Sequence, residues 1–200
     1  MDGKQAAAGG IADDADFEVA FRQHFAPVYR FICRRVGPDL AEDLAADTFA
    51  TAYRRRACYQ PAVASLRSWL YGIAANVLRN HWRAEQRLLA LDAQLPAAAG
   101  MAHYSDAADD HLIAASLAPR LAAALALLPS EQREVLLLYA WAELSHEEIA
   151  AALRIAPGTA RSRLARARAS LREQLGGSGQ DLWVSGGPGI ARQREGNGRA

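Results

Sequence analysis

Lysine is almost absent from this chain of 200 residues: Lys4 is the only one, so arginine supplies nearly all of the positive charge. Guanidinium groups suit two-pronged contacts to phosphates and to base edges. A GC-rich genome would favour arginine equally well. The predominance of arginine is therefore compatible with a nucleic-acid partner but does not by itself indicate one.

Cysteine is scarce as well. Cys33 and Cys58 form no C-x-x-C pair and have no histidine at ligand spacing, which argues against a disulfide framework or a zinc finger. We expect both to be reduced core residues of a cytoplasmic protein. No apolar run approaches the length of a membrane span, and the N-terminus lacks the apolar core of a signal peptide. We therefore predict a soluble protein without membrane insertion.

The usual signs of an enzyme are also missing. The histidines are scattered, without metal-ligand spacing, and no glycine loop is suited to cradle phosphates. They are His24, His81, His103, His111 and His146. No segment shows sustained strand alternation, and no repeat is visible. We predict an all-α protein with no catalytic residue, no metal and no cofactor.

The net charge of +1 conceals a segregated pattern. Residues 16–90 hold eleven arginines against seven acids, and residues 120–175 hold eight against six. Between them, residues 91–119 hold four aspartates and no basic residue. This pattern predicts two small helical domains, 16–90 and 120–175, joined by a flexible acidic linker, 91–119. Residues 1–15 and the glycine-rich residues 176–200 are expected to be disordered, and Trp183 in that tail has no predicted role.

The most specific pattern lies in residues 128–175, into which three helices can be written. Ser130 is a natural N-cap for the first. Ser145 and Glu148 form a capping box that opens a short second helix. Pro157 fits the first position of the third, where its missing N–H costs nothing.

The third helix is basic outside and apolar inside. At 100° per residue its small and aliphatic side chains form one stripe with arginines on both flanks. The stripe is Ala160, Leu164, Ala167 and Leu171; the flanks are Arg161, Arg168 and Arg172 on one side, Arg163 and Arg166 on the other. The pattern is therefore two helices joined by a tight turn, and the second helix is basic outside and apolar inside. This pattern predicts a helix-turn-helix whose second helix enters a DNA major groove. A solvated arginine face is the simpler alternative.

The first basic block begins with two predicted helices. Asp16 is a candidate N-cap for the first, and Asp39 with Glu42 a capping box for the second. Asp43 and Asp47 lie four residues apart on one face of the second helix. Such a pair costs a few tenths of a kcal/mol, which either an external cation or the helix dipole would offset. From these two residues alone, we favour the helix dipole as the effect that offsets their repulsion.

A longer helix is predicted from about residue 66 to residue 87. One side is apolar, with Trp69, Tyr71 and Trp82 expected to pack, and the opposite side has only Asn and Arg. That polar face consists of Asn76, Arg79, Asn80, Arg83 and Arg87. A face without acids favours DNA contact, because solvated surfaces normally mix both signs. In the preceding loop, residues 54–65, Tyr59 and Gln60 either hold an unstacked base or are simply solvated.

Three stretches, in this order, resemble the extracytoplasmic-function group of bacterial RNA polymerase sigma factors. AEDLAADTFATAYRR is similar to the helix that docks on the clamp coiled coil of RNA polymerase. SLRSWLYGIAANVLRNHWRAEQR is similar to the helix that melts promoters and reads the minus-ten element. LPSEQREVLLLYAWAELSHEEIAAALRIAPGTARSRLARARASLRE is similar to the minus-thirty-five-reading domain. The resemblance covers residues 17–175 apart from the linker.

The resemblance implies a non-catalytic initiation factor that binds core polymerase and promoter DNA, and it leaves open an anti-sigma protein as a third partner. It implies polymerase contacts by Asp43, Asp47 and Phe49. It implies minus-ten contacts by Asn76, Arg79, Asn80 and Arg83, and a flipped-base pocket around Tyr59 and Gln60. It implies minus-thirty-five contacts by Thr159, Arg161, Ser162, Arg163 and Arg166. Arg87 and Arg168 complete the predicted DNA-binding set.

Two positions depart from the family pattern. Arg154 stands where the family usually has a turn glycine, and Ala156 where it usually has a capping serine. We therefore expect a less stable turn. The main rival interpretation is a helix-turn-helix regulator that binds an operator without polymerase, but it gives no reason for the first domain. A purely protein-binding helical adaptor is disfavoured by the acid-free face.

Overall fold

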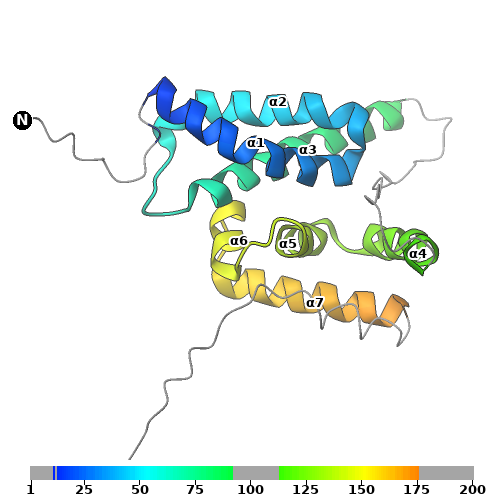
Figure 1. Ribbon diagram of the computed structural model, residues 1–200. Helices are drawn as coiled ribbons and strands as arrows, with labels where there is room; N and C mark the ends of the chain where they lie inside the picture. Colours follow the sequence, from blue (N-terminus) through cyan, green and yellow to red (C-terminus); the bar gives the residue numbers. More distant parts are fainter. Residues whose placement is uncertain (1–10, 12, 92–112, 176–200) are drawn as a thin grey trace, which may run out of the picture.

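The structure of the protein is a computed structural model that describes residues 11, 13–91 and 113–175. These residues form helices and contain no strand, so the predicted all-α class is confirmed (Figure 1). The elements are α1 (Asp14–Val36), α2 (Pro38–Arg54), the 3₁₀ turn η1 (Arg56–Cys58), α3 (Leu66–Leu91), α4 (Ile113–Leu127), α5 (Ser130–Ala140), α6 (His146–Leu153) and α7 (Pro157–Leu175). The predicted disorder of residues 1–10 and 176–200 lies outside the described residues, and so does the linker from residue 92 to residue 112.

The helices α1, α2 and α3 form one group. Gly37 joins α1 to α2 with φ 79° and ψ 170°, a backbone conformation that essentially only glycine adopts. Its N–H donates to the carbonyl oxygen of Cys33 at 2.9 Å and closes α1. The chain can therefore reverse within one residue, which lays α2 along α1 (Figure 1).

Helix α1 begins earlier than the sequence predicted. Asp13, rather than Asp16, is the N-cap, and its carboxylate accepts from the backbone N–H of Asp16 at 2.8 Å. Asp13, Asp14 and Asp16 all suit a helix N-terminus, so composition alone did not select the cap. The predicted disordered segment, 1–15, accordingly overlaps the first turn of α1.

The predicted caps of α2 and α5 are wrong by one residue or more. Helix α2 begins at Pro38 with Gly37 as N-cap and no side-chain cap, so Asp39 lies inside the helix. Proline presets the backbone angle of a first helical residue and starts the helix there. Helix α5 likewise begins at Ser130 itself, after Pro129.

The second group, α4 to α7, contains the predicted helix-turn-helix. The capping box at the start of α6 is confirmed: the Ser145 hydroxyl accepts from the Glu148 N–H at 3.1 Å, and the Glu148 carboxylate accepts from the Ser145 N–H at 3.0 Å. Arg154 ends α6 in the left-handed conformation, with φ 54° and ψ 47°. The apolar stripe of α7 is buried as predicted. Helix α4 begins at Ile113, inside the range predicted as linker.

The two groups pack directly on each other, because α3 lies against α6 (Figure 1). Gly72 of α3 makes this approach possible. A Cβ atom on Gly72 would lie 2.5 Å from the carbonyl oxygen of Ala152 in α6. One continuous hydrophobic cluster consequently runs through both groups.

The cysteine prediction was half right. Both thiols are free, and Cys33 is partly buried against the core. Cys58, however, is exposed, because it lies in the surface turn η1.

Candidate DNA and polymerase interfaces

Helix α7 carries all of the predicted duplex-binding residues, but only some of them lie on its exposed surface. Arg161 and Arg166 are exposed, while Thr159, Ser162 and Arg163 are partly buried. The Ser162 hydroxyl donates to the Thr159 carbonyl at 3.1 Å, so the two polar side chains share the N-terminal turns of α7. This end of a recognition helix is the one that reaches base edges in helix-turn-helix proteins.

Two arginines of α7 already have partners within the chain. Arg163 forms an ion pair with Glu131 of α5. The Arg168 guanidinium lies 4.5 Å from the centroid of the Tyr139 ring. A cation over an aromatic face is held in place, so Arg168 packs α7 on α5 while keeping its charge.

The Asn/Arg face of α3 is present as predicted. Asn76, Asn80, Arg83 and Arg87 are exposed. Arg79 is partly buried and donates to the Asn76 side-chain oxygen at 2.9 Å. It also lies 3.7 Å from the carboxylate of Glu134 on α5.

The segment before α3 holds Tyr59 firmly. The Tyr59 ring lies 5.1 Å from the Trp69 ring, and its hydroxyl donates to the Ala64 carbonyl at 3.2 Å. Burial raises the pKa of Tyr59 above its usual value of 10.0, so the hydroxyl stays protonated at neutral pH. Gln60 beside it is exposed. The loop therefore presents a fixed, partly buried Tyr59 ring beside an exposed Gln60 side chain.

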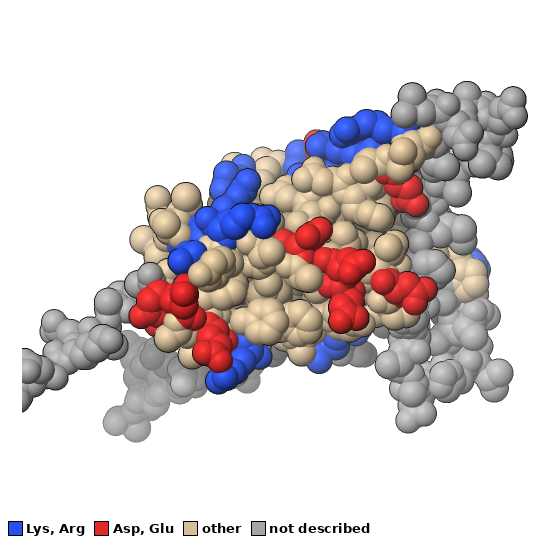
Figure 2. Space-filling model, turned by 90° about the horizontal axis from the view of Figure 1, so that it is seen from above, with Lys and Arg blue, Asp and Glu red and all other residues tan. Residues whose placement is uncertain are grey.

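The acidic face of α2 is open to solvent. Figure 2, which views the molecule from above the α1–α2 side of Figure 1, shows acidic side chains gathered on this surface. The exposed acids of α2 are Asp39, Glu42, Asp43 and Asp47. The geometry of Asp43 and Asp47 thus suits a cationic partner.

Phe49 does not fit the role predicted for it. It is only 3% exposed and packs edge-on against Phe21, with ring centroids 4.9 Å apart, and against Phe25 at 5.6 Å. A side chain enclosed in this way cannot touch a partner. Phe49 instead fixes α2 on α1 and so positions the acidic face.

A buried charge cluster between the two groups was missed by sequence reasoning. Arg35 of α1 donates to Glu134 of α5 at 3.0 Å, and these side chains are 2% and 8% exposed. The Arg35 guanidinium also lies 4.8 Å from the Trp82 ring centroid. One indication that Arg35 is buried was present in the sequence, because helical spacing places it on the same side of α1 as Phe31 and Ile32. Nothing local pointed to its partner 99 residues away.

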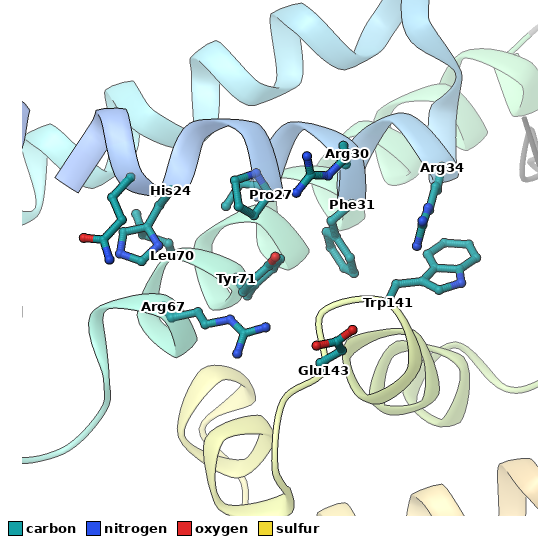
Figure 3. A pocket seen from close by; sticks show the side chains of 12 residues that line it. His24, Pro27, Arg30, Phe31, Arg34, Arg67, Leu70, Tyr71, Trp141 and Glu143 are labelled. Atoms are coloured by element: carbon teal, nitrogen blue, oxygen red, sulfur yellow. The ribbon is translucent and has the colours of Figure 1, made fainter. Parts of the chain in front are cut away.

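A cavity of about 460 Å³ also lies between the two groups, among α1, α3 and the turn from α5 to α6 (Figure 3). Arg67 donates across it to the Ala142 carbonyl, and the Arg34 guanidinium lies 5.9 Å from the Trp141 ring centroid. Burial, and next the nearby Arg67, lower the pKa of His24 below 6.5. Cationic groups of the first helical group therefore hold the second at several points.

Together these features define a two-part DNA-binding protein: a three-helix group with an acid-free Asn/Arg face, and a helix-turn-helix. Family models give the same division. Residues 20–88 match Sigma-70 region 2, and residues 119–171 match Sigma-70, region 4.

The similar proteins point to one family. The chain is 36% identical over 166 residues to RNA polymerase sigma factor CarQ of Myxococcus xanthus, covering 82% of this chain and 91% of that protein. It is 30% identical to ECF RNA polymerase sigma factor RpoE of Cereibacter sphaeroides, covering 82% and 88%. Among solved structures, the sigma factor RpoE from Bartonella quintana, in complex with the anti-sigma factor NepR, matches with TM-score 0.61 at 26% identity, covering 80% of this chain and 96% of that one.

The chain belongs to the extracytoplasmic-function (ECF) group of RNA polymerase sigma factors. It directs promoter-specific transcription initiation, and proteins of this family are initiation factors rather than catalysts. No finding favours the rival operator-binding regulator. Within the described part of the chain, none of the helices has the length and apolarity needed to cross a bilayer.

Proposed function

We propose that three surfaces share the work of this sigma factor. The exposed carboxylates Asp43 and Asp47 of α2 bind a basic surface on the clamp coiled coil of core polymerase. The Asn/Arg face of α3 holds the non-template strand of the minus-ten element. The outer side of α7 fixes the protein on the minus-thirty-five duplex.

The acid-free face of α3 is the observation that carries the proposal. Asn76, Asn80, Arg83 and Arg87 are all exposed along one side of the helix, where a solvated surface would normally mix both signs. Amide groups can pair with adenine edges, and guanidinium groups with guanine or phosphate. Such a face can serve opened DNA, because the base edges and phosphates of an unpaired strand are both open to these groups.

Tyr59 and Gln60 extend this face towards a flipped base. Trp69 and the Ala64 carbonyl hold Tyr59 in place, so its ring needs little ordering when a base stacks on it. The exposed Gln60 amide can then pair with the edge of that base. Arg87 and Arg168 supply phosphate contacts at the far ends of the two DNA-binding surfaces.

The remaining features of the proposal follow from the role itself. The protein acts in the cytoplasm, and polymerase supplies all of the catalysis. An anti-sigma protein is a reasonable third partner, because the similar RpoE from Bartonella quintana was solved with NepR.

In vitro transcription with purified core polymerase and a library of promoters tests the proposal, with start sites read by sequencing. The wild-type chain should confer start-site selection on core enzyme. Arg161→Ala should reduce promoter-specific transcription by about 5- to 150-fold, the 1–3 kcal/mol of one good base contact, while assembly with core polymerase is unchanged. A loss confined to core-polymerase affinity would contradict the assignment of α7 to DNA.

A further inference from the structure

The cavity of about 460 Å³ among α1, α3 and the turn from α5 to α6 is lined by more positive than negative charge. Arg30 and Arg34 of α1 and Arg67 of α3 reach its wall, and Glu143 is the acid among the described residues that line it (Figure 3). Three guanidinium groups against one carboxylate leave a net charge of +2. Within the described part of the chain none of these three arginines forms an ion pair, so the charge is not neutralised there.

Two of these arginines act on the same buried hydroxyl group. Burial raises the pKa of Tyr71 above its usual value of 10.0, and the nearby guanidinium groups of Arg67 and Arg30 oppose that rise. Two helices therefore direct positive charge towards one point of the cavity wall, where the protonated hydroxyl can itself donate. His24 adds little charge, because burial, and next Arg67, lower its pKa and leave the imidazole neutral at neutral pH. The cavity thus favours an anion that accepts hydrogen bonds.

Aromatic side chains form another part of the wall. Phe31 and Tyr71 are buried and pack edge-on, with ring centroids 5.2 Å apart. Trp141 is partly buried, and the Arg34 guanidinium lies 5.9 Å from the centroid of its ring. Indole and guanidinium planes both stack on flat rings, and this stacking is tolerant of which nucleobase is present. An anion that carries a planar ring would use both kinds of wall.

Glu143 reaches the cavity from an unusual backbone conformation. Its φ is 50°, in the left-handed region where a residue with a Cβ atom is strained. Its carboxylate points into the cavity (Figure 3). Strained residues of this kind gather at turns that clamp ligands. A carboxylate on an otherwise cationic wall can accept from hydroxyl groups of the same ligand, as an acid does from the ribose in dinucleotide-binding folds.

We propose that this cavity binds a ribonucleoside monophosphate. The phosphate lies between Arg30 and Arg34, the base lies against Trp141, and the ribose hydroxyl groups donate to Glu143. A phosphate monoester carries a charge of about −2 at neutral pH, which balances the charge of the wall. The volume lies within the range of about 300–1,000 Å³ that small-molecule sites occupy. None of the residues that line this cavity belongs to the surfaces proposed above for polymerase and promoter DNA.

The cavity wall offers variants that separate the parts of the ligand. Arg30→Gln and Arg34→Gln each remove a phosphate contact, and because both side chains are exposed the fold should persist. Glu143→Ala removes the acceptor for the ribose. Arg22→Gln is the matched control, since Arg22 is also exposed on α1 but pairs with Glu18 and does not line the cavity. Circular dichroism checks that each variant folds.

Isothermal titration calorimetry of the full-length protein with AMP measures binding. The wild type should bind one AMP per chain, and adenosine or inorganic phosphate should bind at least about 10-fold more weakly, because each lacks part of the contacts. Arg30→Gln and Arg34→Gln should each weaken AMP binding about 10-fold, the effect of one charge-assisted hydrogen bond, while Arg22→Gln should match the wild type. Deoxy-AMP, which lacks the 2′ hydroxyl, should bind about 10-fold more weakly than AMP to the wild type but equally well to Glu143→Ala.

Several results would overturn the proposal. One is the absence of saturable AMP binding, and another is binding that Arg30→Gln and Arg34→Gln leave unchanged. Equal affinity for AMP and inorganic phosphate would mean that the wall holds an anion without recognising a nucleoside. Binding that is lost in Arg83→Gln but kept in Arg34→Gln would place the nucleotide on the Asn/Arg face of α3 instead. A preference for AMP over deoxy-AMP that persists in Glu143→Ala would refute the proposed binding mode.

Discussion

Replacing Arg154 with glycine should stabilise the helix-turn-helix, although it removes a side chain. Arg154 holds φ 54° and ψ 47° at the end of α6, where its N–H bonds back to the last turn. A left-handed conformation costs a residue with a Cβ atom about 1–2 kcal/mol relative to glycine. The extra freedom of glycine in the unfolded chain returns about 0.4–1 kcal/mol of that gain. The net stabilisation should be about 0.5–1 kcal/mol.

For a helical group of this size, that difference corresponds to a rise of about 2–8 °C in the thermal midpoint. Circular dichroism at 222 nm measures it, and urea titration gives the free energy of unfolding. Arg161→Gly is the matched control, since Arg161 is exposed inside α7 and glycine there should cost about 1 kcal/mol. If Arg154→Gly lowers the midpoint as much as Arg161→Gly does, backbone strain at the turn is not the reason that glycine suits this position.

Three further predictions follow from single contacts. Ser145→Ala removes the side-chain hydrogen bond to the Glu148 N–H and should lower the free energy of unfolding, measured by urea titration, by about 1 kcal/mol. Ser145→Asp should keep most of that stability, because aspartate is also a good N-cap. Asp43→Arg should weaken assembly with core polymerase in a pull-down without changing the thermal midpoint, because Asp43 is exposed; unchanged assembly would remove it from the interface. Burial and Arg67 hold the pKa of His24 below its unfolded value of 6.5, so the unfolded chain takes up the proton first. Stability should therefore fall as the pH drops below about 6.5, and His24→Gln should flatten that part of the curve.

Local patterns predicted the helices well. The capping box at Ser145, the proline that starts α7 and the buried stripe of α7 each depend on neighbours within one or two turns, so the sequence shows them directly. The predicted start of α1 was wrong because Asp13, Asp14 and Asp16 are equally good N-caps when judged from the sequence alone. The exposed positions of Asp43 and of the α3 face followed from helical periodicity alone.

What the sequence could not show was how distant faces meet. Periodicity indicates that Phe49 and Asp43 lie on different sides of α2, but only packing against Phe21 and Phe25 shows that Phe49 is enclosed. An acid at position 134 suits the dipole of helix α5, so nothing local shows that Glu134 is the partner of Arg35 and Arg79. Gly72 carried no signal at all, because its importance comes from a carbonyl oxygen 80 positions further along the chain.

The open acidic side of α2 and the arginines exposed on α3 and α7 have a consequence for how the protein is distributed in the cell. A bacterial chromosome offers on the order of 10⁶ or more nonspecific sites to any protein with free arginines. A scarce regulator with such groups exposed would be diluted across that excess before it met polymerase. The exposed carboxylates of Asp43 and Asp47 on α2 repel DNA phosphate, and this repulsion opposes such dilution at the surface proposed for polymerase.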